Sequence, residues 1–254
     1  MIKSNNTLFV GKVFHEFNSL NSTNQYAIDL LSKTTPAEGT IILAHDQFAG
    51  RGQLTNKWES ASGKNLTFTT ILFPKFLPAR KQFLLNQVVS LSVSDTLKAF
   101  IPKGVKIKWP NDIYVFDKKI TGILIQNSLK GSTLQSAIIG VGLNVNQKKF
   151  ISDAPNPTSM TLEVGKTLDL ALVLQVFCQQ LEKNYLQLKS GHFQTIQERY
   201  LKELFRINET YHFRLPDGTM LKGKIIGVTD IGKLMLKTIN GTEVFAFKEI
   251  GYIL

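Results

Sequence analysis

Residues 47–58 read QFAGRGQLTNKW, and the other motifs of the chain can be placed relative to this stretch. The apolar run TIILA at residues 40–44 precedes it and predicts a buried strand. Two glycines around Arg51 let the backbone pass close to a ligand and offer its N–H groups to an anion. Lys57 adds positive charge, and Trp58 adds a flat face on which a ring can stack. The stretch suits a nucleotide phosphate beside an organic ring, although a Gly-Arg-Gly loop alone is also typical of a surface turn.

The composition is that of a globular protein with a large core. The 254 residues are 43% hydrophobic and include no run of about eighteen apolar residues, so no transmembrane helix and no membrane partner are expected. The first residues, MIKSNN, lack the apolar core of a signal peptide, and we expect a cytoplasmic protein. Cys178 is the one cysteine, which excludes an internal disulfide, and the four histidines have no metal-binding spacing. No metal site held by protein ligands is predicted.

The net charge of the chain is +11. Residues 205–254 contribute only +2 of it, so most of the excess lies in the preceding part. Such an excess can attract nucleic acid, an acidic small molecule or an acidic protein partner. Because no lysine-rich tract with interleaved aromatic residues occurs, nucleic acid is the least favoured of these partners.

Hydrophobic periodicity predicts a mixture of helices and strands before residue 205. Strands are expected at residues 65–73, 105–109, 113–116, 120–125 and 136–146. Helices are expected at residues 26–31, 80–100, 170–188 and 192–203. The first of these strands alternates as if half-buried, and residues 113–125 are expected to form a hairpin around DKK at residues 117–119. Cys178 falls inside a helix and is predicted to be a packed core thiol.

The pattern changes to short strands from Tyr211 onward. Three turn signals separate these strands, namely PDG at residues 216–218, DIG at 230–232 and NG at 240–241. This tail is typical of a small antiparallel barrel. We therefore predict two domains, residues 1–205 and residues 206–254.

A polar cluster, STN at residues 22–24, stands just ahead of the first predicted helix. Ser22, Thr23 and Asn24 are all good helix N-caps, and capping is the simpler interpretation. The same hydroxyls and amide can also hydrogen-bond the polar head of a ligand.

The order of the motifs closely resembles that of the biotin–protein ligases. The shared pieces, in order, are STN at 22–24, Gln47 with GRG at 50–52, KW at 57–58, KWPND at 108–112, Lys119 with GIL at 122–124, and GVGLNVN at 140–146. The resemblance runs from about residue 14 to the C-terminus and is looser in the tail; KWPND is its most specific piece. It implies an α+β fold in which helices pack on a central mixed or antiparallel sheet, as in class II aminoacyl-tRNA synthetases. It also implies a small C-terminal SH3-like barrel.

The resemblance implies a two-step reaction with ATP, biotin and Mg²⁺. Biotin's carboxylate attacks the α-phosphate of ATP, giving biotinyl-5′-AMP and pyrophosphate, and a carrier-protein lysine then attacks this anhydride and releases AMP. The expected partner is the biotin carboxyl carrier protein of acetyl-CoA carboxylase or of a related carboxylase. About thirteen residues precede the ligase-like region, too few for a DNA-binding winged helix, so we expect the monofunctional type, without DNA binding, as a monomer or homodimer.

The resemblance also assigns roles to residues. The expected catalytic residues are Arg51, Lys119 and Asp112. The expected binding residues are Ser22, Thr23, Asn24, Gln47, Gly50, Arg51, Gly52, Gln53, Lys57, Trp58, Asn111, Lys119, Gly122 and Asn144. The polar cluster and Gln47 would hold biotin's ureido ring, and residues 51–53 would cover its carboxylate and the α-phosphate. Lys119 would bridge these two groups, and Asn144 would contact the nucleotide.

Some of these residues have a simpler interpretation. Lys119 by itself is typical of a solvated lysine in a hairpin turn, and Trp109 is predicted to pack in the core. Gln53 departs from the family pattern, because many members carry arginine there.

Three rival functions fit parts of the pattern. A lipoate–protein ligase shares the fold and the adenylation chemistry, but lipoate needs an apolar slot where residues 22–24 and Gln47 offer polar groups. An octanoyl transferase would need an accessible loop cysteine, which Cys178 is not expected to be. A non-catalytic nucleic-acid binder would explain the net charge but not the KWPND run or Lys119.

Overall fold

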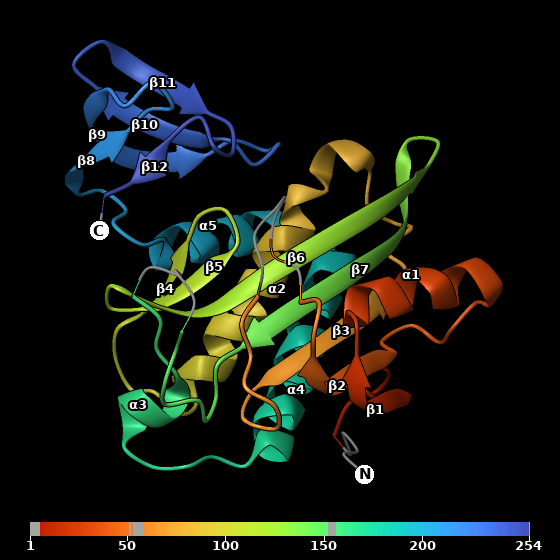
Figure 1. Cartoon of the computed structure of the whole chain (residues 1–254). Helices are drawn as coiled ribbons and strands as arrows, with labels where there is room; N and C mark the ends of the chain where they lie inside the picture. The colour runs from red at the N-terminus through yellow and green to blue at the C-terminus, as the bar shows by residue number, and fades with distance from the viewer. Residues whose placement is uncertain (1–5, 51, 53–57, 152–155, 254) are drawn as a thin grey trace.

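The computed structural model describes residues 6–50, 52, 58–151 and 156–253. It contains one seven-stranded sheet with helices on both faces and one five-stranded sheet formed by the C-terminal part of the chain (Figure 1). This arrangement confirms the predicted α+β class.

The larger sheet is mixed. Its strands are β1 (Phe14–Leu20), β2 (Ile41–Gln47), β3 (Leu66–Leu72), β4 (Val105–Lys108), β5 (Asp112–Val115), β6 (Lys118–Lys130) and β7 (Thr133–Leu143). The spatial order is β1-β2-β3-β7-β6-β5-β4. β1 pairs with β2 in parallel, and every other pair in this sheet is antiparallel.

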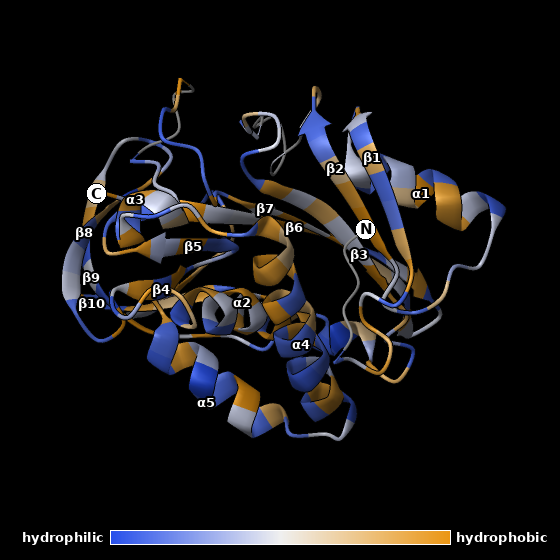
Figure 2. Cartoon of the chain, turned by 90° about the horizontal axis from the view of Figure 1, so that it is seen from below, coloured by the Kyte–Doolittle hydropathy of each residue, from blue (hydrophilic) through white to orange (hydrophobic). Residues whose placement is uncertain are grey.

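Helices cover both faces of this sheet. They are α1 (Thr23–Lys33), α2 (Phe83–Lys98), α3 (Met160–Val164), α4 (Leu170–Lys189) and α5 (Phe193–Glu203), with a short 3-10 turn at Ala79–Lys81. Figure 2 shows α2, α4 and α5 on one side of the sheet, and along α4 and α5 apolar and polar residues are mixed as expected for amphipathic helices. Cys178 is fully buried in α4, which confirms the predicted core thiol, and burial raises its pKa to about 12.

β3 corrects one expectation, because all seven of its residues are buried rather than every second one. Consecutive side chains of a strand point to opposite faces. Phe68 packs edge-on against Phe177 of α4, with 4.8 Å between ring centroids, whereas Thr69 faces α1 and donates to Asn24 Oδ1. The strand is therefore enclosed by a helix on each face.

The hairpin of β5 and β6 corrects a second expectation. The turn between these strands contains only Phe116 and Asp117, and Lys118 and Lys119 already belong to β6. Lys119 is therefore held by a strand ladder rather than by a solvated turn. Neither β1 nor the short helix α3 was predicted from the sequence.

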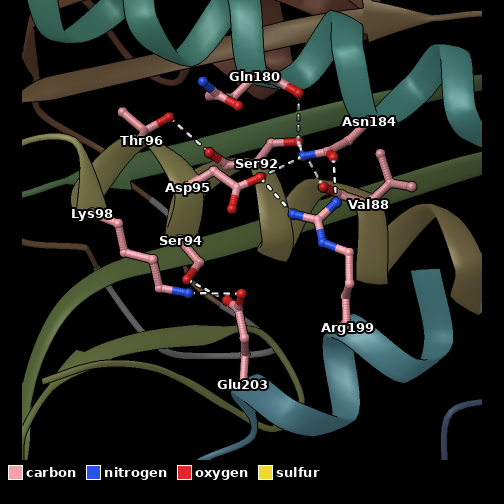
Figure 3. A network of polar contacts seen from close by, with 10 residues as sticks. All are labelled: Val88, Ser92, Ser94, Asp95, Thr96, Lys98, Gln180, Asn184, Arg199 and Glu203. Atoms are coloured by element: carbon pink, nitrogen blue, oxygen red, sulfur yellow. Dashed lines mark hydrogen bonds and ion pairs between the residues drawn. The ribbon is translucent and has the colours of Figure 1, made fainter. Parts of the chain in front are cut away.

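A polar network joins α5 to the helices beneath the sheet (Figure 3). Arg199 of α5 pairs with Asp95 of α2 at 2.8 Å and donates to Asn184 Oδ1 of α4 at 2.9 Å. Asn184 in turn donates to Asp95 at 3.1 Å. Near the end of α5, Glu203 pairs with Lys98 at 2.7 Å. These contacts fix α5, the last element before the C-terminal sheet, against the core.

The C-terminal sheet is antiparallel throughout. Its strands are β8 (Thr210–Arg214), β9 (Met220–Val228), β10 (Leu234–Thr238), β11 (Gly241–Phe245) and β12 (Gly251–Tyr252). The order is β11-β10-β9-β8-β12, as expected for a small SH3-like barrel. Each of the three predicted turns carries a glycine with positive φ, between 88° and 113°, a backbone region that favours glycine.

The two sheets touch through specific contacts. Trp109 is 4% exposed, as predicted for a core residue, and its Nε1 donates to Gly232 O at 2.8 Å. Phe83 of α2 lies over Gly232, where an added Cβ would come within 2.5 Å of the ring. Arg206, which follows α5, lies 3.9 Å from Asp117 in the turn between β5 and β6 and donates to Ile253 O at 2.6 Å near the end of the chain. Buried side chains of both sheets belong to one core cluster. The predicted division after residue 205 stays a prediction.

Within the part of the chain that the structure describes, none of the helices has the length and apolarity needed to span a membrane.

Candidate active site

A cavity of about 290 Å³ opens at the junction of the larger sheet, α1 and the C-terminal sheet. Ten of the predicted site residues line it: Ser22, Thr23, Asn24, Gln47, Gly52, Trp58, Asn111, Asp112, Lys119 and Gly122. These residues come from positions far apart in the chain, and the fold brings them to one place. Arg51, Gln53 and Lys57 lie outside the described residues.

The N-terminus of α1 forms a polar end of the cavity. Ser22 caps the helix by accepting from Gln25 N, so the capping interpretation is correct for this residue. Thr23 donates to Gln47 Oε1 through its backbone N (2.9 Å) and through its hydroxyl (3.2 Å). Asn24 donates to Gln126 Oε1 at 3.0 Å. Residues 23, 24 and 47 are therefore oriented before any ligand arrives.

Glycine is needed where this polar end meets the sheet. A Cβ on Gly140 of β7 would lie 3.0 Å from Asn24 Cγ, which is too close for the amide to keep its place. Gly140 and Gly142 belong to the GVGLNVN motif, but no role in the site was predicted for either residue.

Trp58 lies flat against the middle of the sheet. A Cβ on Gly142 would come within 2.5 Å of the indole Nε1, and one on Gly122 would lie 3.0 Å from Cζ3. The two neighbouring glycines thus leave a bare strip of backbone that the indole covers. Trp58 Nε1 is buried and has no hydrogen-bond partner among the described residues. Its backbone N donates to Gly50 O at 3.0 Å, which draws together the two ends of the loop.

An ion pair occupies the next part of the wall. Lys119 Nζ lies 2.8 Å from Asp112 Oδ1, with the two side chains 25% and 20% exposed. Both residues belong to neighbouring strands, so the pair is held by the sheet. Asn111 is buried and donates to Ile123 O at 2.5 Å, which fixes the turn that presents Asp112. This pair offers a cation and a carboxylate on a surface that a ligand can reach.

Lys108 and Tyr252 line the far wall, and neither was predicted as a site residue. Lys108 Nζ donates to Tyr114 OH at 2.9 Å and lies 5.0 Å from the centroid of the Tyr252 ring. Burial lowers the pKa of Lys108 to about 8 and raises the pKa of Tyr114 and of Tyr252 above the ordinary tyrosine value. Lys108 belongs to the KWPND motif, which was a usable signal; nothing in the tail singled out Tyr252.

Gly50 and Asn144 stand apart from the cavity wall. Asn144 is buried, donates to Thr158 O at 3.0 Å and has an Oδ1 with no partner among the described residues. Its side chain supports the chain segment around residue 158, and its predicted contact with a nucleotide stays a prediction.

Comparison with known proteins identifies the family. Residues 16–144 match the model of the biotin/lipoate A/B protein ligase family. The bifunctional ligase/repressor BirA of Bacillus subtilis is 32% identical over 236 residues, which cover 91% of this chain and 70% of that protein. A biotin–acetyl-CoA-carboxylase ligase of Paracoccus denitrificans is 28% identical, with 90% and 96% covered.

Solved structures agree with these matches. The biotin protein ligase of Aquifex aeolicus in complex with biotin and ATP superimposes with a TM-score of 0.78 and 26% identity, covering 94% of this chain and 98% of the other. The biotin protein ligase of Leishmania major in complex with biotinyl-5-AMP shares the fold, with a TM-score of 0.65 and 22% identity. The chain belongs to the biotin/lipoate A/B protein ligase family.

Proposed function

We propose that this chain is an ATP-dependent biotin–protein ligase, which makes biotinyl-5′-AMP and transfers the biotinyl group to a lysine of a carrier protein. The proposal rests on the spatial order of three groups of side chains along the wall of one cavity. A fixed polar pocket at the N-terminus of α1 is followed by an indole on glycines and then by the Lys119–Asp112 pair. The related Aquifex enzyme was solved with biotin and ATP together.

The polar pocket favours biotin over lipoate. Biotin's ureido ring carries two N–H donors and a carbonyl acceptor, and burying them without partners costs roughly 1–3 kcal/mol each. Thr23, Asn24 and Gln47 offer hydroxyl and amide groups that are held in place by one another and by the sheet. Lipoate's dithiolane ring has no N–H donor or carbonyl acceptor and would leave these groups without hydrogen-bond partners.

Lys119 is assigned to the first step. A biotin carboxylate oxygen attacks the α-phosphorus, and the bond from phosphorus to the bridging oxygen of pyrophosphate breaks. Negative charge gathers on the phosphoryl oxygens in the transition state, where a fixed cation is most effective. Lys119 is a compact point charge held by β6 and by Asp112. Arg51, Gly52, Gln53 and Lys57 are assigned to the loop that covers these groups.

We expect Mg²⁺ to bind mainly through the phosphates of ATP rather than in a site formed entirely by protein side chains. Among the described residues, no three His, Cys, Asp or Glu side chains gather to hold a metal ion. Mg²⁺ usually keeps several waters and binds through one or two carboxylates and substrate phosphates. Asp112 is the carboxylate in the cavity wall, so the residues present fit an ion carried in by ATP. Bound there, the ion would neutralise phosphate charge.

Asp112 is assigned to the second step. The attacking carrier lysine must lose a proton before its nitrogen adds to the biotinyl carbonyl, and AMP leaves with the electron pair. A carboxylate at the reacting centre can accept and orient that ammonium group. No enzyme nucleophile is required, and the buried Cys178, with its pKa raised to about 12, is unsuited to be one. The acceptor is assigned as a biotin carboxyl carrier domain.

The test is ATP–pyrophosphate exchange with biotin and with lipoate as the acid. We expect exchange with biotin and at least a hundredfold less with lipoate at equal concentration, because the site's polar groups would stay unpaired. Asn24→Leu should reduce biotin-dependent exchange, whereas Gln25→Leu should not, because the half-buried Gln25 side chain bonds to Asp29 and does not line the cavity. Equal exchange with both acids, or none with biotin, would reject the proposal.

A further inference from the structure

Thr69 lies directly behind the polar pocket formed by Thr23, Asn24 and Gln47. It is the central residue of β3, and its side chain is fully buried and is not part of the cavity wall. Its hydroxyl oxygen lies 2.6 Å from Asn24 Oδ1 and 2.8 Å from the hydroxyl oxygen of Thr23. Through this one hydroxyl, the sheet contacts both polar side chains at the start of α1.

The hydrogens of the two threonine hydroxyls can be assigned by counting. A hydroxyl has a single hydrogen, and the amide oxygen of Asn24 can only accept. If Thr69 gave its hydrogen to Thr23, this buried oxygen would have no donor among the described residues. Thr69 therefore donates to Asn24, and the 2.8 Å contact between the hydroxyls uses the hydrogen of Thr23. That hydrogen is shared with Gln47 Oε1, which lies further away at 3.2 Å.

The orientation of the Asn24 amide is fixed from the other side. Its Nδ2 donates to Gln126 Oε1 at 3.0 Å and to Leu124 O at 3.4 Å, both on β6. Because a backbone oxygen such as Leu124 O can only accept, the amide nitrogen must face β6 and the amide oxygen must face β3. Asn24 thus links the two strands, and Thr69 supplies the donor that completes the link.

This arrangement gives the polar pocket a direction. The hydrogen of Thr23 points toward the sheet and Gln47, so the Thr23 oxygen keeps a lone pair for the cavity, which it lines. Gln47 has the opposite character. Its Oε1 accepts from Thr23 N at 2.9 Å, so its Nε2 is the donor that Gln47 can offer to a ligand. The pocket therefore offers one acceptor and one donor from neighbouring residues.

A ring N–H beside a carbonyl is the ligand chemistry that matches this pair. The N–H can donate to Thr23 Oγ1 while the carbonyl oxygen accepts from Gln47 Nε2, and biotin's ureido ring has such an edge. If the hydrogen of Thr23 pointed into the cavity instead, it would face the ligand's N–H. One of these two donors would then be buried without an acceptor, which is unfavourable.

We propose that Thr69 determines the direction of the hydrogen bonds in the polar pocket, and thereby the selectivity of the pocket for a ring N–H beside a carbonyl. Thr69 is a positioning residue, because it acts through Thr23 and Asn24 and does not itself touch the ligand. The proposal rests on the proposed function, since it concerns how biotin is recognised.

Thr69→Val tests this role by removing the hydroxyl while nearly keeping the shape of the side chain. Asn24 Oδ1 then loses its donor, and the hydrogen of Thr23 is free to turn into the cavity. We expect the Kd for biotin, measured by titration calorimetry on the full chain, to rise about tenfold or more. The KM for ATP and the kcat of exchange at saturating biotin should stay within about twofold. Thr69→Ser keeps the hydroxyl and should bind biotin within about threefold of the wild type.

Thr70→Val is the matched control. Thr70 is the next residue of β3 and is equally buried, but its side chain points to the opposite face of the sheet. Its hydroxyl has no hydrogen-bond partner among the described residues. The same substitution therefore removes a hydroxyl from the same strand without changing the pocket, and Thr70→Val should bind biotin as the wild type does.

Two biotin analogues distinguish the direction of a hydrogen bond from a general loss of structure. In each, oxygen replaces one of the ring N–H groups, so a lone pair stands where biotin has a hydrogen. For the wild type, the analogue that places this oxygen against Thr23 should bind at least about tenfold more weakly than biotin. In Thr69→Val this ratio should fall below about threefold, because the freed hydrogen of Thr23 can turn to the oxygen. A loss of packing alone would leave the ratio unchanged.

Three results would overturn the inference: wild-type biotin affinity in Thr69→Val, an equal loss in Thr70→Val, or an analogue ratio that Thr69→Val does not change. If Thr69→Val does not fold, the wild type decides, because binding both analogues as tightly as biotin is contrary to a fixed acceptor at Thr23. A wild-type protein without biotin-dependent exchange would instead reject the proposed function.

Discussion

Gly142→Ala tests whether the bare glycine strip positions Trp58. An alanine Cβ at this position would lie 2.5 Å from the indole Nε1, whereas non-bonded heavy atoms rest at about 3.5–4.0 Å. The ring must therefore retreat by roughly 1 Å or more. Overpacking of this kind costs about 1–3 kcal/mol.

We expect this cost to fall on binding rather than on folding. Trp58 is half-buried at the end of a loop, so moving the indole off the sheet is easier than moving β7. The displaced ring would intrude on the ligand's space. If about 2 kcal/mol is transmitted to the bound state, biotin affinity falls roughly thirtyfold. The melting temperature should fall by no more than a few degrees, since 1 kcal/mol corresponds to about 2–4 °C in a chain of this size.

Two other glycines provide a graded control. At Gly122 the added Cβ would lie 3.0 Å from the indole, so Gly122→Ala should show a smaller loss. Gly227 is also in a strand, β9, but its nearest neighbour would be Met235 Sδ at 3.8 Å, and Gly227→Ala should behave as wild type.

The assay combines biotin titration calorimetry, exchange kinetics and thermal melting for the three variants. The expected order of loss in biotin affinity is Gly142→Ala, then Gly122→Ala, then Gly227→Ala. Wild-type biotin affinity in Gly142→Ala would refute the reasoning, as would a loss in Gly227→Ala of similar size.

Three further predictions concern the ion pair, the helix network and the thiol. Lys119→Ala should reduce the rate constant of adenylation at least a hundredfold, because its ammonium group stabilises charge on the phosphate in the transition state. The melting temperature should change little, since the side chain is not part of the core. Rapid biotinyl-5′-AMP formation by this variant would contradict the assignment. Arg199→Ala should leave Asp95 without its cation and lower the free energy of unfolding by about 2 kcal/mol. The melting temperature should then fall by about 4–8 °C. Gln194→Ala, on the exposed side of α5, should melt as the wild type does. Cys178 should resist iodoacetamide at pH 8 until the protein unfolds, because burial raises its pKa to about 12; mass spectrometry showing fast labelling of the native protein would count against this.

Helices and turns were predicted well where the sequence shows one clear signal, either apolar residues at helical spacing or a glycine turn. The long apolar series of α2 and α4 and the three glycine turns of the tail appear where the sequence placed them. The strand at β3 was placed correctly, yet its burial was misjudged. Its threonines looked like a solvent face, whereas Thr69 is buried against α1. A polar residue that hydrogen-bonds inside the protein cannot be told from an exposed one by periodicity alone.

The candidate site was predicted only in part, for a related reason. Ser22 and Lys119 carried recognisable motifs, but their neighbours depend on pairing between distant strands. Gly122 and Gly142 lie side by side beneath Trp58 because β6 pairs with β7, and Tyr252 meets Lys108 because the C-terminal sheet packs against the end of β4. Such meetings are set by tertiary structure, which single-sequence patterns do not encode.

The cavity's walls come from nearly opposite ends of the chain, with Ser22 on one side and Tyr252 on the other. The residues of the polar pocket, of the glycine strip and of the Lys119–Asp112 pair are all translated before the C-terminal strands. The far wall comes last, because β12 can pair with β8 only after residue 252 has emerged from the ribosome. The cavity is therefore complete only when the last strand has been translated and has paired. Activation of biotin would then begin only when translation of this region is over.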